Sequence, residues 1–185
     1  MKFYEMQIEG LTRRLPICSL TDDLSIAGFV LFGDTEITEV CAKRLLELAP
    51  DFDVIVTAEA KGIPLAYEMS KQCGKKYVIL RKKPKLYMVD VIQTDVESIT
   101  TAHVQSLCIG SLEAEDIRNK RVLVVDDVIS TGGSLAAIEA ILSQIEGCTI
   151  VDKMCILAEG AALKRDDITY LEELPLFTPD GEPIE

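Results

Sequence analysis

Residues 122–134 constrain the fold of this chain more than any other feature, since their sequence is Val-Leu-Val-Val-Asp-Asp-Val-Ile-Ser-Thr-Gly-Gly-Ser. The four apolar residues that open it are typical of a strand buried on both faces. Apolar residues recur at helical spacing after the loop, at Leu135, Ile138, Ile141, Leu142 and Ile145. The stretch therefore predicts a strand, a loop and a helix in direct succession, as in α/β proteins with a parallel sheet.

The loop at this strand-to-helix junction is suited to bind an anion. The first backbone N–H groups of a helix have no partner within the helix, and the helix dipole places positive charge beside them. Glycines let the backbone approach a phosphate closely, and hydroxyl groups add further donors. The predicted phosphate site comprises Ser130, Thr131, Gly132, Gly133 and Ser134.

Asp126 and Asp127 distinguish this loop from other phosphate loops. Carboxylates beside a phosphate would repel it unless they face another group, and a pair of sugar hydroxyls is the obvious partner. The stretch lacks both the Walker pattern and the Gly-x-Gly-x-x-Gly pattern of dinucleotide-binding folds. It therefore indicates a ribose-phosphate site, and the alternative is a buried strand followed by a solvated acidic turn.

The same residues resemble the signature of the type I phosphoribosyltransferase family. That family has a single α/β domain, with an open, mainly parallel twisted sheet flanked by helices, a small hood and a flexible loop. The resemblance covers about residues 50–160, and it implies one domain over residues 1–185, with a hood from about residues 1–33 and part of the C-terminal tail. It also implies that Asp126 and Asp127 hold the ribose hydroxyls of 5-phosphoribosyl-1-diphosphate (PRPP), and that the loop holds its 5′-phosphate.

A second loop, at residues 59–62, also lies between a predicted strand and a predicted helix. In an open parallel sheet it would lie at the same carboxyl edge as the first loop, where ligands bind. The sequence Glu-Ala-Lys-Gly-Ile-Pro-Leu-Ala is similar to the pyrophosphate loop of adenine and archaeal hypoxanthine phosphoribosyltransferases. The resemblance implies that Glu59, Ala60, Lys61 and Gly62 bind PRPP, and the alternative is an ordinary helix start with an exposed lysine.

A third feature is a basic stretch in an acidic protein. Seven Lys and Arg residues and no acidic residue lie between Glu68 and Asp90, whereas the formal net charge of the chain is −12. This concentration favours an anionic small molecule as ligand, with a solvated basic surface as the alternative. It resembles the family's flexible catalytic loop, which implies that Arg81, Lys82 and Lys85 reach the pyrophosphate and that closure excludes water.

The resemblance implies a purine salvage enzyme, a pentosyltransferase that moves 5-phosphoribosyl from PRPP to a purine base and releases pyrophosphate. Its expected catalytic residues are Asp126, Asp127, Lys61 and Arg81. Mg²⁺ is the expected cofactor, bridging PRPP oxygens with few protein ligands. Phe29 in the expected hood is the candidate to stack on the base, although an aromatic residue in an apolar strand is more often part of the core.

The acceptor base is predicted from weaker similarities. Adenine is placed first, while hypoxanthine, guanine and xanthine are alternatives, since residues 96–101 are similar to a stretch of xanthine phosphoribosyltransferases. Thr100 and Thr101 stand where adenine enzymes usually have a Glu-Tyr pair. A non-catalytic PRPP-binding regulator is a rival from another class, although the first 50 residues show no helix-turn-helix pattern.

Composition restricts the compartment and the partners. At 185 residues and 48% hydrophobic content, the chain can form one domain with a sizeable core. Its six cysteines form no Cys-x-x-Cys pair, which argues against zinc and against a disulfide framework. No segment approaches 18 consecutive apolar residues, and the negative charge disfavours nucleic acid. We therefore expect a cytoplasmic protein with no membrane or nucleic-acid partner, and the resemblance implies a homodimer.

Local periodicity predicts the remaining elements. A strand at 53–57, a helix at 63–73 and a strand at 77–80 form a βαβ unit with a parallel strand pair. Further strands are predicted at 3–9, 104–109, 121–125 and 149–157, and helices at 36–48 and 133–146. Residues 84–101 lack a clear period, and the proline-containing tail from Leu174 is predicted to be a packed loop.

Overall fold

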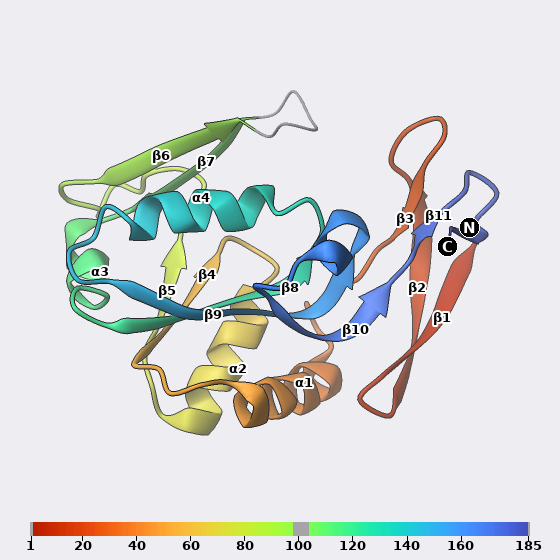
Figure 1. The fold of residues 1–185 in the computed structure, drawn as a ribbon, viewed down its shortest axis with the longest axis horizontal. Helices are drawn as coiled ribbons and strands as arrows, with labels where there is room; N and C mark the ends of the chain where they lie inside the picture. Colours follow the sequence, from red (N-terminus) through yellow and green to blue (C-terminus); the bar gives the residue numbers. More distant parts are fainter. Residues whose placement is uncertain (1, 98–103, 185) are drawn as a thin grey trace.

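The computed structural model describes residues 2–97 and 104–184. Its centre is a parallel sheet of five strands in the order β10-β9-β8-β4-β5 (Figure 1). The strands are β4 (Val54–Ala58), β5 (Tyr77–Leu80), β8 (Arg121–Ile129), β9 (Thr149–Glu159) and β10 (Thr169–Leu174). The predicted α/β class with a parallel sheet is confirmed.

Helices cover both faces of this sheet (Figure 1). α1 (Thr35–Leu48) and α2 (Ile63–Cys73) pack on one face, and α4 (Gly133–Leu142) packs on the other. Leu123 and Val125 of β8 belong to the core beneath α1 and α2, whereas Val122 and Val124 belong to the core beneath α4. Because both faces of β8 are buried, its sequence is apolar without interruption. None of the helices in the described ranges is long and apolar enough to cross a membrane.

Strand β8 is longer than predicted. It continues through Asp126 and Asp127 to Ile129, because β9 keeps pairing with it that far along the chain. On its other side, β4 pairs with β8 only as far as Val124. The edge of β8 that faces β4 is therefore open at the two acids, which lie within the strand rather than after it.

Helix α4 is shorter than predicted, since it ends at Leu142 and not at Glu146. The N–H groups of Gln144 and Ile145 each bond to a carbonyl three residues back, at 3.0 and 3.1 Å. Such bonds tighten the chain into turns at a helix end. The apolar spacing continues into these turns, and Ile145 remains buried.

A second sheet is entirely antiparallel and stands beside the first (Figure 1). It contains β1 (Phe3–Ile8), β2 (Leu11–Ser19), β3 (Ser25–Ala27), β11 (Leu176–Phe177) and β12 (Pro183–Ile184). The prediction of a loop from Leu174 onward is therefore wrong. Phe177 pairs with Ser25 and is fully buried, and its ring packs edge-on against Tyr4 with centroids 5.0 Å apart. A strand of two residues has no periodicity to detect, and its pairing is long-range.

One ion pair links the two sheets through α1. Asp34 caps α1, since its carboxylate accepts a hydrogen bond from the Ile37 N–H at 3.4 Å. Arg13 of β2 donates to both oxygens of the same carboxylate, at 2.6 and 2.9 Å. The Arg13 guanidinium holds the pKa of Asp34 below its usual value. The cap of α1 thus also fixes β2 against the helix.

Strands β6 (Ile92–Glu97) and β7 (Val104–Ile109) form an antiparallel ribbon over α4 (Figure 1). The sequence predicts β7, but β6 falls in the stretch without clear period. Ile92 packs against the core beneath α4, whereas Gln93 and Asp95 are exposed, so few apolar residues mark the strand. The short helix α3 (Ser111–Glu115) after β7 was not predicted either.

Candidate active site

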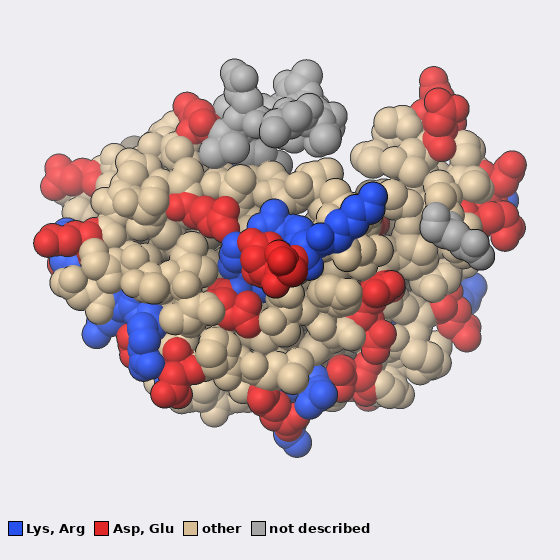
Figure 2. All heavy atoms as spheres, viewed as in Figure 1, with Lys and Arg blue, Asp and Glu red and all other residues tan. Residues whose placement is uncertain are grey.

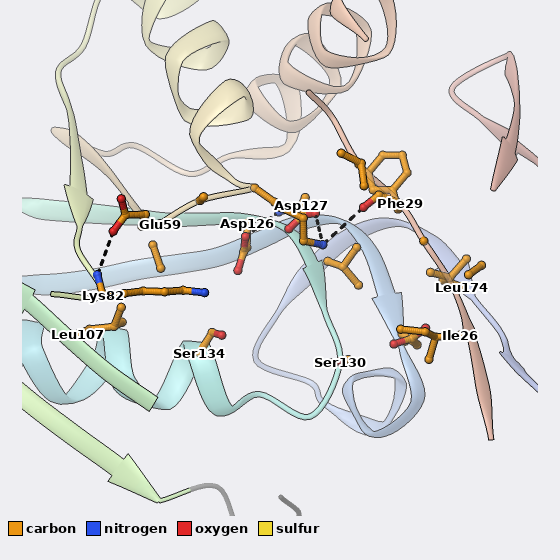
Figure 3. Close-up of a pocket in the computed structure, with 18 residues that line it drawn as sticks. Ile26, Phe29, Glu59, Lys82, Leu107, Asp126, Asp127, Ser130, Ser134 and Leu174 are labelled. Carbon is orange, nitrogen blue, oxygen red and sulfur yellow. Dashed lines mark hydrogen bonds and ion pairs between the residues drawn. The ribbon is translucent and has the colours of Figure 1, made fainter. Parts of the chain in front are cut away.

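The candidate site lies where the order of the strands reverses. β4 leads outward to β5 on one side, and β8 leads outward to β9 on the other, so a crevice opens between the carboxyl ends of β4 and β8. A cavity of about 470 Å³ occupies it and extends to the second sheet (Figure 3). The lining residues are 26–30, 58–61, Lys82, Leu107, 126–128, Ser130, Ser134, Glu159 and Leu174.

Asp126 and Asp127 line the cavity from the open edge of β8 (Figure 3). Asp127 is 3% exposed, and its Oδ2 lies 2.8 Å from Lys61 Nζ. Asp126 Oδ1 accepts a hydrogen bond from the backbone N–H of Asp127 at 2.9 Å. Burial, reinforced by the charge of Asp127, raises the pKa of Asp126 well above its usual value. The pair therefore offers closely spaced acceptor oxygens, as two neighbouring hydroxyl groups require.

The loop between β4 and α2 brings Lys61 to these acids. Lys61 Nζ also donates to the backbone carbonyl of Phe29 at 3.4 Å, so one ammonium group links β8 to the segment after β3 (Figure 3). About half of its side chain is exposed, although its partner Asp127 is buried. A cation at the cavity wall with one side open to solvent can exchange its partner for an anionic ligand.

Gly62 lets this loop pack tightly. A Cβ atom at Gly62 would lie 2.3 Å from Thr57 Oγ1 and 2.8 Å from Asp126 Oδ1, both closer than real Cβ contacts. The close approach requires glycine, because neither neighbour lies at the end of a long, flexible side chain. The loop therefore rests directly on the acid that it faces.

We expect Gly62→Ala to lower the free energy of unfolding by about 1–3 kcal/mol, since the added methyl group forces the loop away from Thr57 and Asp126. Urea denaturation followed by circular dichroism measures the change. Gly28→Ala is the matched control, because its Cβ would approach no atom closer than 3.4 Å. Equal stability of the Gly62→Ala variant and the wild type would contradict the close packing.

Glu59 organises the basic segment after β5. Its carboxylate accepts a hydrogen bond from the backbone N–H of Lys82 at 3.1 Å and lies 3.5 Å from Arg81 Nη1 and 3.9 Å from Lys85 Nζ. These contacts, chiefly the Lys82 N–H, hold the pKa of Glu59 below its usual value. Arg81 is further fixed by two backbone hydrogen bonds to Cys108 of β7, of 2.8 and 2.7 Å. The segment is thus positioned at the margin of the cavity.

The loop between β8 and α4 encloses a second, smaller cavity of about 120 Å³. Gly132 has a φ of +79°, the left-handed region that favours glycine, and α4 begins at the next residue. The cavity is bounded by Asp126 and residues 128–135. Its size and the helix N-terminus beside it suit a single phosphate group.

Arg165 lies beside this loop, which the sequence did not indicate. A Cβ at Gly132 would lie 3.2 Å from Arg165 Nη1. The guanidinium donates to both oxygens of Asp167, at 2.8 and 2.7 Å, and Lys153 contacts the same carboxylate. Figure 2 shows basic and acidic side chains clustered at the centre of this face. Lys153 of β9 also pairs with Glu139 of α4, so the network ties the segment after the short helix η1 (Gly160–Lys164) to β9 and α4.

The structure brings most of the predicted site residues to one crevice. The main cavity is lined by Glu59, Ala60, Lys61, Lys82, Asp126, Asp127, Ser130 and Ser134, and the smaller one also by Thr131, Gly132 and Gly133. Gly62 packs against Thr57 and Asp126, and Arg81 and Lys85 flank Glu59. Thr100 and Thr101 lie outside the described residues.

Phe29 lines the cavity, but its side chain is 4% exposed and belongs to the core beneath α1 and α2. Its backbone carbonyl contacts Lys61. Stacking of Phe29 on a base stays a prediction.

Sequence reasoning missed Glu159, a buried carboxyl group at the cavity wall. The available signal was an acidic residue directly after the apolar end of a predicted strand.

The comparisons with known proteins agree with this geometry. A family model for the phosphoribosyl transferase domain matches residues 34–175. A hypoxanthine/guanine phosphoribosyltransferase of Methanococcus voltae is 34% identical over 133 residues, covering 72% of this chain and 67% of that protein. HGPRTase-like protein 1 of Halalkalicoccus jeotgali is 36% identical over 159 residues, covering 85% of this chain and 83% of that protein.

Solved structures are similar in fold. The crystal structure of an adenine phosphoribosyltransferase from Thermoanaerobacter pseudethanolicus has a TM-score of 0.65 and 19% identity, covering 92% of this chain and 95% of that one. The enzyme from Trypanosoma brucei, solved with AMP, pyrophosphate and ribose-5-phosphate, has a TM-score of 0.64 and 19% identity, covering 92% and 76%. At this identity the likeness shows the fold alone.

Proposed function

The chain belongs to the phosphoribosyltransferase family, and from this premise we propose that it transfers 5-phosphoribosyl from PRPP to a purine base and releases pyrophosphate. The observation that carries the proposal is the contact of 2.8 Å between Lys61 and Asp127, which joins a pyrophosphate-type loop to ribose-type acids at one cavity. A volume of about 470 Å³ lies in the range of sites for small ligands.

The predicted residues divide between the two ends of PRPP in this proposal. Asp126 and Asp127 accept hydrogen bonds from the ribose hydroxyls, and residues 130–134 donate to the 5′-phosphate. Lys61 exchanges its contact with Asp127 for the pyrophosphate group, and the basic residues beside Glu59, Arg81 among them, add charge at that end. Catalysis then consists of positioning and of stabilising negative charge on the leaving pyrophosphate.

We infer that Mg²⁺ binds together with PRPP. In the part of the chain that the structure describes, no cluster of three or more His, Cys, Asp or Glu side chains could hold a metal by itself. The carboxylates of Asp126 and Asp127 nevertheless suit a hard cation that shares its ligands with substrate oxygens. When bound, Mg²⁺ would neutralise charge on the pyrophosphate.

We place a 6-oxopurine, hypoxanthine or guanine, first as the acceptor. The relatives with this named activity are 34–38% identical to the chain, whereas the adenine enzymes are similar in fold at 19% identity or less.

We also propose that the second sheet is the hood of a single domain over residues 1–185. A cytoplasmic location fits the six cysteines, all of which are free.

The test is an assay of pyrophosphate release with PRPP, Mg²⁺ and adenine, hypoxanthine, guanine or xanthine, each added singly. Release with one or more bases is the expected result. Binding of PRPP by calorimetry without release with any base would instead favour a non-catalytic regulator. The absence of both PRPP binding and pyrophosphate release would overturn the proposal.

We further propose that the chain forms a homodimer. Phe32 and Tyr67 are 57% and 55% exposed, and they border one hollow that is mostly apolar. Large exposed apolar side chains that lie together are typical of an interaction surface. We expect Phe32→Glu to convert the dimer to a monomer in sedimentation velocity, because the patch would have to bury a charge. A wild-type protein that sediments as a monomer at micromolar concentration would contradict this.

A further inference from the structure

Glu159 is the last residue of β9, and its carboxyl group lines the main cavity although the residue is only 7% exposed. Its side chain makes no hydrogen bond and no ion pair with any other residue in the ranges 2–97 and 104–184. Because its carboxylate lines the cavity, hydrogen-bond donors for it can come only from what enters that cavity. Such a group is expected where a ligand supplies the missing donors.

The position of Glu159 within the cavity indicates which part of a ligand it would face. Ile26 and Leu174 lie together at one end, and Lys82 lies at the opposite end (Figure 3). Glu159 pairs through its backbone with Leu174, so it belongs to the apolar end. The other charged lining residues are taken by the proposed ribose and pyrophosphate contacts. Glu159 is therefore the charged group left for the base.

The chemistry of the apolar end suits a planar heterocycle. Ile26 and Leu174 contribute apolar surface there, which can cover the faces of a ring. Ligand sites with apolar walls depend on a few polar groups to fix orientation. An ionised carboxylate is an acceptor only, so it selects ring edges that present N–H groups.

This inference rests on the proposed function. We propose that Glu159 is a specificity-determining residue, whose carboxylate accepts hydrogen bonds from N–H groups on the six-membered ring of the purine. Guanine presents two parallel donors, its N1–H and its 2-amino group, which match the two carboxylate oxygens. Hypoxanthine presents N1–H alone. Adenine presents the lone pair of N1, which an ionised carboxylate repels.

Hydrogen bonds from the N–H groups of the base would favour the ionised form of Glu159. Burial raises the pKa of Glu159, and the positive charge of Lys61 acts in the opposite direction. Lys61 lines the same cavity as Glu159 and comes from the loop after β4. The order of preference that follows is guanine, then hypoxanthine, then adenine.

Glu159→Gln tests the proposal, because the amide keeps the shape of the side chain but replaces one acceptor oxygen with a donor. We expect kcat/KM for guanine to fall by about 10–100-fold, as for loss of a hydrogen bond to a charged group. The value for adenine should change less than 3-fold, about the scatter expected without a lost contact, and KM for PRPP should stay the same. If Glu159 had only a structural role, the variant would have kcat/KM lowered equally for all bases.

The matched control is Glu173→Gln on β10, an exposed carboxylate on the neighbouring strand. It should leave the ratio of guanine to adenine activity unchanged. If Glu159→Gln fails to fold, Glu159→Asp carries the same test, because it keeps the charge but withdraws the carboxylate by one methylene. Glu159→Asp should also lower kcat/KM for guanine more than kcat/KM for adenine.

The outcomes separate this inference from the proposed function. No pyrophosphate release by the wild type with any base overturns both. Release by the wild type, with a base ratio that Glu159→Gln and Glu159→Asp leave unchanged, overturns the role of Glu159 alone. An equal fall for guanine, hypoxanthine and adenine, at unchanged KM for PRPP, also overturns it.

Discussion

Asp127→Asn lowers the turnover of pyrophosphate release by about 10²–10³-fold, the expected cost of losing one preorganised electrostatic contact at the reacting centre. In the wild type the buried Asp127 carboxylate pairs with Lys61 at 2.8 Å and lies at the proposed ribose position. The amide presents a donor to the ribose hydroxyls and removes the negative charge that favours a developing positive charge on the sugar. It also leaves Lys61 without its partner.

Steady-state rates at saturating PRPP and base, with calorimetry for PRPP binding, measure the effect. Asp166→Asn is the control, since that carboxylate is exposed and lies outside the crevice. It should leave turnover unchanged. Near-normal release by Asp127→Asn would remove Asp127 from the catalytic set, and with it the ribose site.

Asp126→Asn is expected to raise the free energy of unfolding at neutral pH by about 1–3 kcal/mol, while it lowers turnover. Burial raises the pKa of Asp126 in the folded protein above its usual 3.8, so the folded state binds this proton more tightly than the unfolded chain. The stability of the protonated form is fully present below pH 3.8 and is lost as the pH rises through the raised pKa. Asparagine keeps the oxygen that accepts the Asp127 N–H and carries no charge.

Urea unfolding of wild type and Asp126→Asn at several pH values measures the difference. The free energy of unfolding of Asp126→Asn, relative to that of the wild type, should increase as the pH rises from 4. The matched control is Asp34→Asn, whose wild-type carboxyl has a lowered pKa because Arg13 donates to it. That variant should lose stability at neutral pH, and its deficit should shrink as the pH falls. A difference between wild type and Asp126→Asn that does not change with pH would contradict the raised pKa.

The elements that sequence predicted well are those whose burial leaves a local pattern. The βαβ unit of β4, α2 and β5 agrees with prediction to within a residue at each end, because α2 has one apolar face, β4 is buried and β5 alternates between buried and half-buried residues. The loop before α4 was predicted from its glycines, and Gly132 has the left-handed conformation that favours this residue, which is also a local demand. The cap of α1 is local too, since Asp34 accepts a hydrogen bond from Ile37, three residues further on.

The elements that sequence missed depend on distant partners. β2 is held by β1 and β3, and β11 is held by β3 from the other end of the chain. β8 extends past its predicted end because β9 continues beside it. None of these pairings leaves a pattern within the strand's own sequence, since a backbone hydrogen bond requires little of the side chains.

The sequence by itself determined which chemical groups the site contains: two acids after an apolar run, a glycine-bearing loop at a helix start and a lysine after a second strand. Only the tertiary structure decided that Lys61 contacts Asp127, that the edge of β8 stays open at its acids and that Glu159 shares their cavity. The physical reason is that residue types and loop conformations are local properties of the chain. Distances between loops depend on the order of strands in the sheet, which brings the ends of β4, β8 and β9 side by side.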